Sequence, residues 1–195
     1  MPLYALALCR KEWKRLLWIT MLKTQAPLDT AATGASGLDA VLFREGMSRV
    51  AGAVHVVSTG GAMGRAGFTA TAIAPVTDSP ASLLVCVNTE SRSAQALLAN
   101  GVFCVNTLSA ADTMLADIFA GRADLQGEAR FSVGEWETLA TGSPVLTSAL
   151  VAFDCRLTDA RIVATHHVII GEIVAVRIGE HRPALVYQDR AYRQL

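Results

Sequence analysis

The last third of the chain alternates with a period of two residues. One side of the first run carries Val151, Phe153, Cys155 and Leu157, and the other side carries Ala152, Asp154, Arg156 and Thr158. The same alternation returns between residues 168 and 178. Successive side chains of a β-strand point to opposite faces, so this period predicts two long strands. A chain organised around such strands is expected to be mainly β.

Four more runs rich in apolar, β-branched and small residues precede this region. They cover residues 53–59, 67–76, 82–88 and 102–108. Turn residues bound these runs, which is typical of strands. A few short helices are expected near residues 38–50, 92–99 and 109–119. About six strands with so few helices favour a closed, six-stranded antiparallel β-barrel, because closure removes exposed strand edges.

The first 37 residues differ in composition from the remainder. Residues 1–22 mix apolar and basic side chains, whereas residues 23–37 are rich in Ala, Thr, Gly and Ser. We interpret residues 1–37 as an N-terminal extension with a linker and residues 38–195 as one folded domain. The initial apolar segment is interrupted by charges before it reaches the roughly 20 residues of a membrane span. We therefore expect no membrane association.

Charge, cysteine spacing and missing motifs exclude several function classes. Lys plus Arg and Asp plus Glu both number 17, which argues against a nucleic-acid surface. The four cysteines are far apart and form no C-x-x-C pair, as expected for free thiols of a cytoplasmic protein. The sequence has no G-x-G-x-x-G, P-loop, G-x-S-x-G or H-E-x-x-H motif. A Rossmann nucleotide site, a serine hydrolase and a zinc peptidase are thus disfavoured.

Small polar residues lie within the second predicted strand, residues 67–76. Thr69 and Thr71 alternate with Phe68 and Ala70. Such a strand would let a flat ring lie against the backbone and form hydrogen bonds with it. The same pattern also occurs in strands for packing reasons alone, so the segment is open to both interpretations.

A second polar segment joins a predicted strand to a predicted helix. Asn88 is followed by Ser91, Arg92 and Ser93. Free backbone N–H groups at a helix start favour an anion, and the hydroxyls and guanidinium add donors, so the segment could hold a monophosphate. Alternatively, Ser91 only caps the helix. If so, Arg190 or Arg193 near the C-terminus could be the phosphate ligand.

Several segments, taken in order, resemble the flavin reductase family of split-barrel flavoproteins, the small components of two-component flavin-dependent monooxygenases. The resemblance begins near residue 43 and rests on FREGMSRVAGAVHVVST, GRAGFTATAIAPVTDSPASLLVCVN, the Ser91-Arg92-Ser93 stretch, FCVNTLS, FAGR, ATHHVIIGEI and LVYQDRAYR. It implies a six-stranded split β-barrel of Greek-key topology. It also implies a homodimer with the flavin near the subunit interface.

The resemblance further implies which residues contact the flavin. They are Phe68, Thr69, Ala70, Thr71, Asn88, Ser91, Arg92, Ser93, Asn106, Leu108 and His166. His166 matches a family histidine that commonly follows Gly-Asp, where this chain has Ala164 and Thr165. We expect His166 and Tyr192 to position the nicotinamide or the edge of the flavin ring.

The implied activity is hydride transfer from NADH to FMN, with the reduced flavin passed to a partner monooxygenase. FAD in place of FMN and NADPH in place of NADH stay open. A different interpretation is a flavin-binding module that stores or relays electrons without accepting hydride from NAD(P)H. An interaction barrel with no cofactor is a third interpretation, because one fold can serve many functions.

Overall fold

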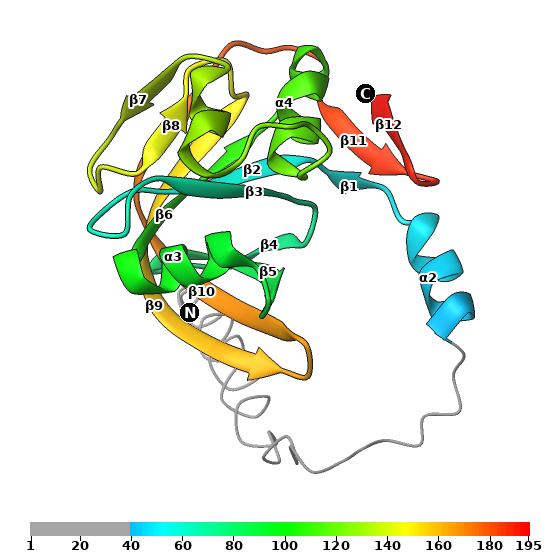
Figure 1. Ribbon diagram of the computed structural model, residues 1–195, viewed down its shortest axis with the longest axis horizontal. Helices are drawn as coiled ribbons and strands as arrows, with labels where there is room; N and C mark the ends of the chain where they lie inside the picture. The colour runs from blue at the N-terminus through cyan, green and yellow to red at the C-terminus, as the bar shows by residue number, and fades with distance from the viewer. Residues whose placement is uncertain (1–39) are drawn as a thin grey trace, which may run out of the picture. The chain divides into compact units, whose positions relative to one another are not determined.

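The computed structural model describes residues 40–195, which form a mainly β fold with a few short helices (Figure 1). Residues 1–37, interpreted above as an extension and linker, lie outside the described residues, so that interpretation stays a prediction. Within residues 40–195, no helix is both long enough and apolar enough to cross a membrane.

Within residues 40–195, the largest sheet has seven antiparallel strands, so the expected number of six is not confirmed. Their order across the sheet is β3-β2-β6-β9-β10-β5-β4. Their bounds are β2 His55–Thr59, β3 Ala66–Ala70, β4 Ile73–Asp78, β5 Ala81–Asn88, β6 Val102–Thr107, β9 Val151–Val163 and β10 His166–Ile178. The two outermost strands, β3 and β4, do not pair with each other in the described part of the chain. The backbone ladder therefore does not close into a barrel.

The seventh strand results from a break inside a segment predicted as one strand. Residues 67–76 were expected to be continuous, but Thr71 and Ala72 belong to neither β3 nor β4. β3 pairs with β2, whereas β4 pairs with β5 at the other end of the sheet. The chain thus crosses between the sheet's two ends at Thr71 and Ala72, and this crossing leaves β3 as an edge strand.

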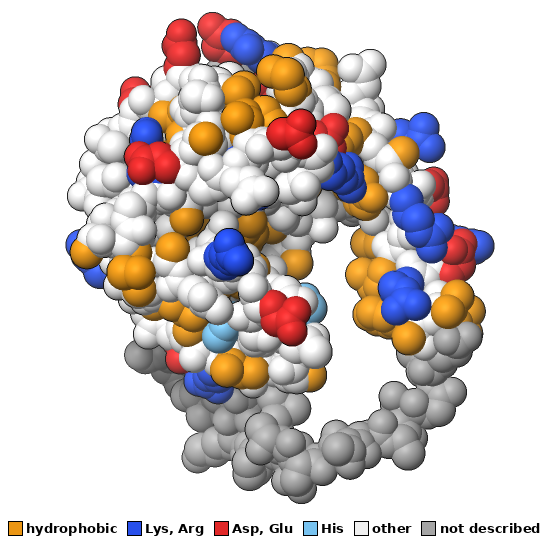
Figure 2. All heavy atoms as spheres, in the orientation of Figure 1, with side chains coloured by type: hydrophobic (Ala, Val, Ile, Leu, Met, Phe, Trp, Pro, Cys, Tyr) orange, Lys and Arg blue, Asp and Glu red, His pale blue; other side chains and the backbone are white. Residues whose placement is uncertain are grey.

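In the part of the chain that the structure describes, two smaller sheets and five short helices complete the fold. β1 (Gly52–Ala53), β11 (Leu185–Gln188) and β12 (Ala191–Gln194) form one sheet, and β7 (Trp136–Thr138) and β8 (Pro144–Leu146) form the other. The helices are α2 (Ala40–Ser48), α3 (Arg92–Asn100), α4 (Thr113–Phe119) and the 3₁₀ helices η1 (Ala110–Asp112) and η2 (Gly127–Ser132). None of the α2 residues is buried, and apolar side chains gather on this helix (Figure 2).

The long strands β9 and β10 pair along most of their length, as their alternation predicts. Near the start of β9, however, both faces are covered. Cys155 packs in one apolar cluster with Phe103, whereas Ala152 on the other face packs with Cys104 and Val145. The segment that carries β8 supplies this second cover, which explains why alternation there does not separate a buried face from an exposed one.

Candidate functional site

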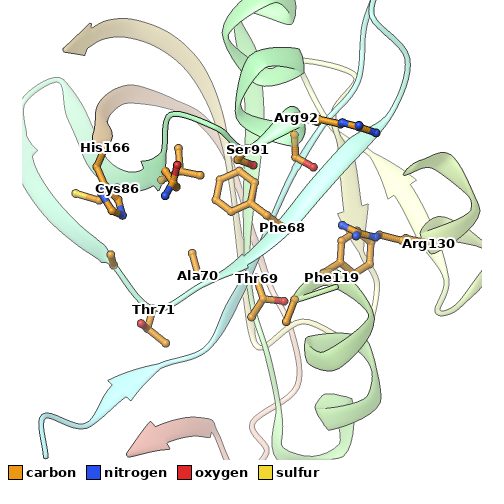
Figure 3. A pocket seen from close by; sticks show the side chains of 15 residues that line it. Phe68, Thr69, Ala70, Thr71, Cys86, Ser91, Arg92, Phe119, Arg130 and His166 are labelled. Carbon is orange, nitrogen blue, oxygen red and sulfur yellow. The ribbon is translucent and has the colours of Figure 1, made fainter. Parts of the chain in front are cut away.

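A pocket of about 510 Å³ lies beside the edge strand β3 (Figure 3). Its wall combines β3, the ends of β5 and α4, the start of α3, η2 and the start of β10. The lining residues are Phe68, Thr69, Ala70, Thr71, Ala72, Cys86, Val87, Asn88, Ser91, Arg92, Ser93, Phe119, Ala120, Arg130 and His166. Segments almost 100 residues apart in the sequence therefore meet at one cavity.

Nine of the residues expected to contact a flavin lie on this one pocket. They are Phe68, Thr69, Ala70, Thr71, Asn88, Ser91, Arg92, Ser93 and His166. The resemblance and the strand-end pattern proposed these residues as a group, and the fold brings the group together. Arg130, Phe119 and Cys86 line the same pocket but were not identified from the sequence.

Asn106 and Leu108 are not brought to the pocket. Both are fully buried. The amide nitrogen of Asn106 donates to Val56 O at 3.1 Å and to Ser58 Oγ at 3.0 Å, and its oxygen accepts from the backbone N–H of Leu146 at 2.8 Å. The hydrogen bonds of the Asn106 amide are thus made inside the fold.

The strand β3 presents free backbone groups to the pocket because it pairs on one side only, with β2. The carbonyl of Gly67 points away from β2, since it accepts hydrogen bonds from Ser93 and Arg130. Backbone groups of alternate residues along a strand point to the same side, so the N–H and C=O of Thr69 lie on this side as well. An edge strand of this kind can hydrogen-bond to a flat polar ring.

The side chain of Thr69 has a structural role. Its hydroxyl donates to Ala116 O at 2.6 Å, which ties β3 to α4. Gly67 allows a close approach at the same place, because a Cβ there would lie 2.8 Å from Phe119 Cε1. Any larger residue at this position would displace the Phe119 ring from the pocket wall.

The start of α3 carries the polar segment predicted as a phosphate site. Ser91 caps the helix, and its hydroxyl accepts from the N–H of Ala94 at 3.3 Å. Arg92 is exposed, and within the described residues it has neither a hydrogen bond nor an ion pair. The capping interpretation is therefore correct for Ser91, while the guanidinium of Arg92 stays available for a ligand.

His166 begins β10 and pairs with Asn88 of β5. Its Nδ1 shares a hydrogen bond of 3.0 Å with the hydroxyl of Thr165. Ala164 adopts a positive φ of 51° in the preceding turn, a conformation that glycine takes more readily. The Ala164–Thr165 pair thus forms the turn and supplies a hydrogen-bond partner for the imidazole.

Tyr192 lies outside the larger pocket and lines a smaller one of about 190 Å³. Both pockets share Thr69, Ala70, Thr71 and Ala120 as lining residues. The Tyr192 ring packs edge-on against Tyr187, with centroids 5.5 Å apart, and lies 5.6 Å from the Arg122 guanidinium. Burial raises the pKa of Tyr192 above its usual value, so its phenol stays protonated near neutral pH.

The larger pocket favours an anion. Its lining includes Arg92 and Arg130 but no Asp or Glu. The alternative phosphate ligands are placed elsewhere, because Arg190 pairs with Glu45 at 2.8 Å and neither it nor Arg193 lines the pocket. Residues 40–195 contain no group of three His, Cys, Asp or Glu side chains suited to a metal ion.

Comparisons with known proteins agree with this geometry. The flavin reductase like domain family matches residues 47–195. FMN reductase (NADH) RutF of Ancylobacter novellus is 47% identical over 170 residues, covering 86% of this chain and 93% of that protein. Its counterpart in Agrobacterium fabrum is 42% identical over 174 residues, covering 89% and 97%.

A solved structure of a flavin reductase component has a similar fold. BorF, the flavin reductase component of a bacterial two-component tryptophan halogenase, is 30% identical with a TM-score of 0.75. The similarity covers 80% of this chain and 98% of that one. With matches that span nearly the whole described domain, the chain belongs to the flavin reductase like domain family.

Proposed function

We propose that this protein is an NADH-dependent FMN reductase that supplies reduced flavin to a partner monooxygenase. One observation carries the proposal: nine residues expected to contact a flavin line one pocket, beside an open strand edge and a free guanidinium. The names of similar proteins support the choice of FMN and NADH. FAD and NADPH stay as alternatives that the assay below separates.

The pocket suggests how a flavin would be held. The ring would lie along β3, where Thr69 offers backbone hydrogen bonds and Phe68 and Ala70 line the wall. Asn88 would contact the ribityl chain, and the start of α3 with Arg92 would hold the phosphate. His166, which lines the larger pocket, and Tyr192, which lines the smaller one, would position the nicotinamide or the ring edge.

The bound flavin and nicotinamide supply the redox chemistry, namely hydride transfer between their rings. The protein therefore needs no nucleophile and no metal, only a surface that orders two rings in sequence. The adjoining pockets fit this requirement, because they share residues 69–71 and Ala120 and together could hold two ligands side by side.

We further propose that the curved seven-stranded sheet is the family's split barrel and that the chain forms a homodimer. The exposed apolar side chains of α2 support self-association, since such patches commonly mark interfaces.

A second candidate function is a flavin module that relays or stores electrons without NAD(P)H. It would use the larger pocket but not the smaller one.

The test is a steady-state assay of NADH and NADPH oxidation with FMN, FAD or riboflavin added in turn. We expect NADH oxidation that depends on added FMN, with lower rates for NADPH. Flavin binding without oxidation of either nucleotide would favour the electron-relay module. Background rates together with no flavin binding would overturn the proposed function.

A further inference from the structure

Arg130 extends from η2 into the larger pocket, although no sequence motif marks it. In Figure 3, Arg92 and Arg130 lie on one side of the Phe68 ring, whereas His166 and Cys86 lie on the other. A flavin with its ring toward His166 would therefore direct its phosphate toward the two arginines.

The guanidinium of Arg130 is held in place before any ligand arrives. Its Nε donates to Leu125 O at 3.2 Å, and its Nη1 donates to Gly67 O at 3.3 Å. The Gly67 carbonyl also accepts from the Ser93 hydroxyl at 2.9 Å. One backbone carbonyl of β3 thus fixes one donor from η2 and one from α3 beside each other.

The charge of Arg130 is not neutralised by the described residues. The nearby carboxylate of Glu128 instead pairs with Arg65 at 2.9 Å, and no ion pair involves Arg130. A guanidinium has five N–H donors, and the two bonds above use two of them. The remaining donors and the positive charge are available to a dianionic group in the pocket.

We infer that Arg130 is the second cation of the flavin phosphate site and that it makes the pocket specific for phosphorylated flavin. The inference rests on the proposed function. Arg92 is exposed and approaches from the start of α3, whereas Arg130 is anchored to two carbonyls. An anchored guanidinium loses little freedom when it binds, so Arg130 is expected to contribute at least as much to specificity as the exposed Arg92.

The test compares FMN with riboflavin, which lacks the phosphate, in fluorescence titrations of Arg130→Met and Arg130→Lys. Met keeps an apolar stem but removes all donors. We expect the FMN Kd to rise about 10- to 100-fold in Arg130→Met, as for one lost charge-assisted hydrogen bond. Riboflavin binding should change little, and Arg130→Lys should recover part of the FMN affinity as a point charge.

The matched control is Arg65→Met. Arg65 also fixes η2, through Glu128 and through the Phe131 ring at 5.2 Å, but it does not line the pocket. If η2 only needs anchoring, Arg65→Met and Arg130→Met will weaken both flavins alike. Equal weakening of FMN and riboflavin by Arg130→Met would overturn the inference.

A third measurement separates the flavin phosphate from the diphosphate of NADH, which has similar chemistry. A raised KM for NADH with an unchanged FMN-to-riboflavin ratio in Arg130→Met would overturn the assignment to the flavin. The wild-type protein separates the two levels of the proposal. If the wild type binds FMN no more tightly than riboflavin, both the inference and the FMN assignment are overturned. If the wild type prefers FMN and Arg130→Met keeps that preference over riboflavin, the inference alone is overturned.

Discussion

Two polar regions of the same sheet, the interior around Asn106 and the pocket edge around Asn88, contain similar residue types but differ in their hydrogen bonds. In the interior, Asn106 is bonded to Val56, Ser58 and Leu146. Among the described residues, no buried side-chain N or O lacks a hydrogen bond. At the pocket edge, Arg92 has no partner and β3 has free backbone groups. Polar groups that are satisfied internally stabilise the fold, whereas those left open can bind a ligand.

The largest effect is expected in the interior. Asn106→Ala would leave two or more buried groups without partners, at about 1–3 kcal/mol each, so the free energy of unfolding should fall by about 3 kcal/mol or more. Urea unfolding measures this loss. The ratio of FMN to riboflavin affinity should be unchanged in the folded fraction.

Asn88→Ala is the matched variant at the pocket edge. Asn88 is exposed, and among the described residues its side-chain oxygen accepts only from the N–H of Glu90, at 2.8 Å. We expect unfolding close to wild type and weaker flavin binding. If Asn106→Ala instead weakened flavin binding while stability stayed intact, the contrast between the two regions would be wrong, and the implied flavin contact of Asn106 would be supported.

A slightly smaller effect concerns the buried His55. Burial lowers its pKa from 6.5 to about 4, and its Nδ1 contacts Thr107 Oγ1 at 3.1 Å. The unfolded chain binds a proton at His55 more readily than the folded protein does. Stability should therefore be complete above about pH 6.5 and fall by about 3 kcal/mol as the pH drops through 6.5 toward 4.

His55→Gln isolates this dependence, because Gln cannot titrate in that range. Its stability profile between pH 4 and 7 should be flatter than that of the wild type in urea unfolding. Equal slopes for wild type and His55→Gln would mean that other groups cause the acid sensitivity.

The sequence predicted the mainly β class, the long strands near the C-terminus and most of the pocket wall. The sequence did not predict features that depend on contacts between segments far apart in the chain. Asn88 and Asn106 both lie in strand-like runs. Asn106 is buried because the β8 segment, about 40 residues later in the chain, packs over it and bonds to its side chain. The break at Thr71 could not be predicted either, because residues 71 and 72 are Thr and Ala and include none of the usual turn residues Gly, Pro, Asn or Asp.

Arg130 shows the same limit within the site. It belongs to a 3₁₀ helix without a motif, and its place in the pocket depends on the Gly67 carbonyl, 63 residues earlier. Local patterns report which face of one strand is apolar. They do not predict which distant segment packs on that strand. That packing decides whether a polar side chain forms its hydrogen bonds inside the fold or keeps them available for a ligand.

At the pocket edge, Arg92→Ala should weaken FMN binding much more than riboflavin binding, because only FMN carries the phosphate. One charge-assisted hydrogen bond contributes about 1.5–3 kcal/mol, which corresponds to about 10- to 100-fold in affinity. Parallel titrations with the two flavins measure the ratio. Equal losses would assign Arg92 to the fold or to the ring, and no change would leave α3 as a capped helix only.

The smallest effect is expected from deleting residues 1–20. This segment precedes the family match at residues 47–195, and both polar regions are built from residues within that match. Truncation at Met21 should therefore leave the free energy of unfolding within about 0.5 kcal/mol of the full chain, the usual range for changes away from packed or bonded groups. FMN-dependent NADH oxidation should also be unchanged.

A large loss of stability or of flavin binding would show that the N-terminal segment completes one of the two regions. A lower unfolding midpoint with an intact preference for FMN over riboflavin would point to the interior around Asn106. An unchanged midpoint with a lost preference would point to the pocket.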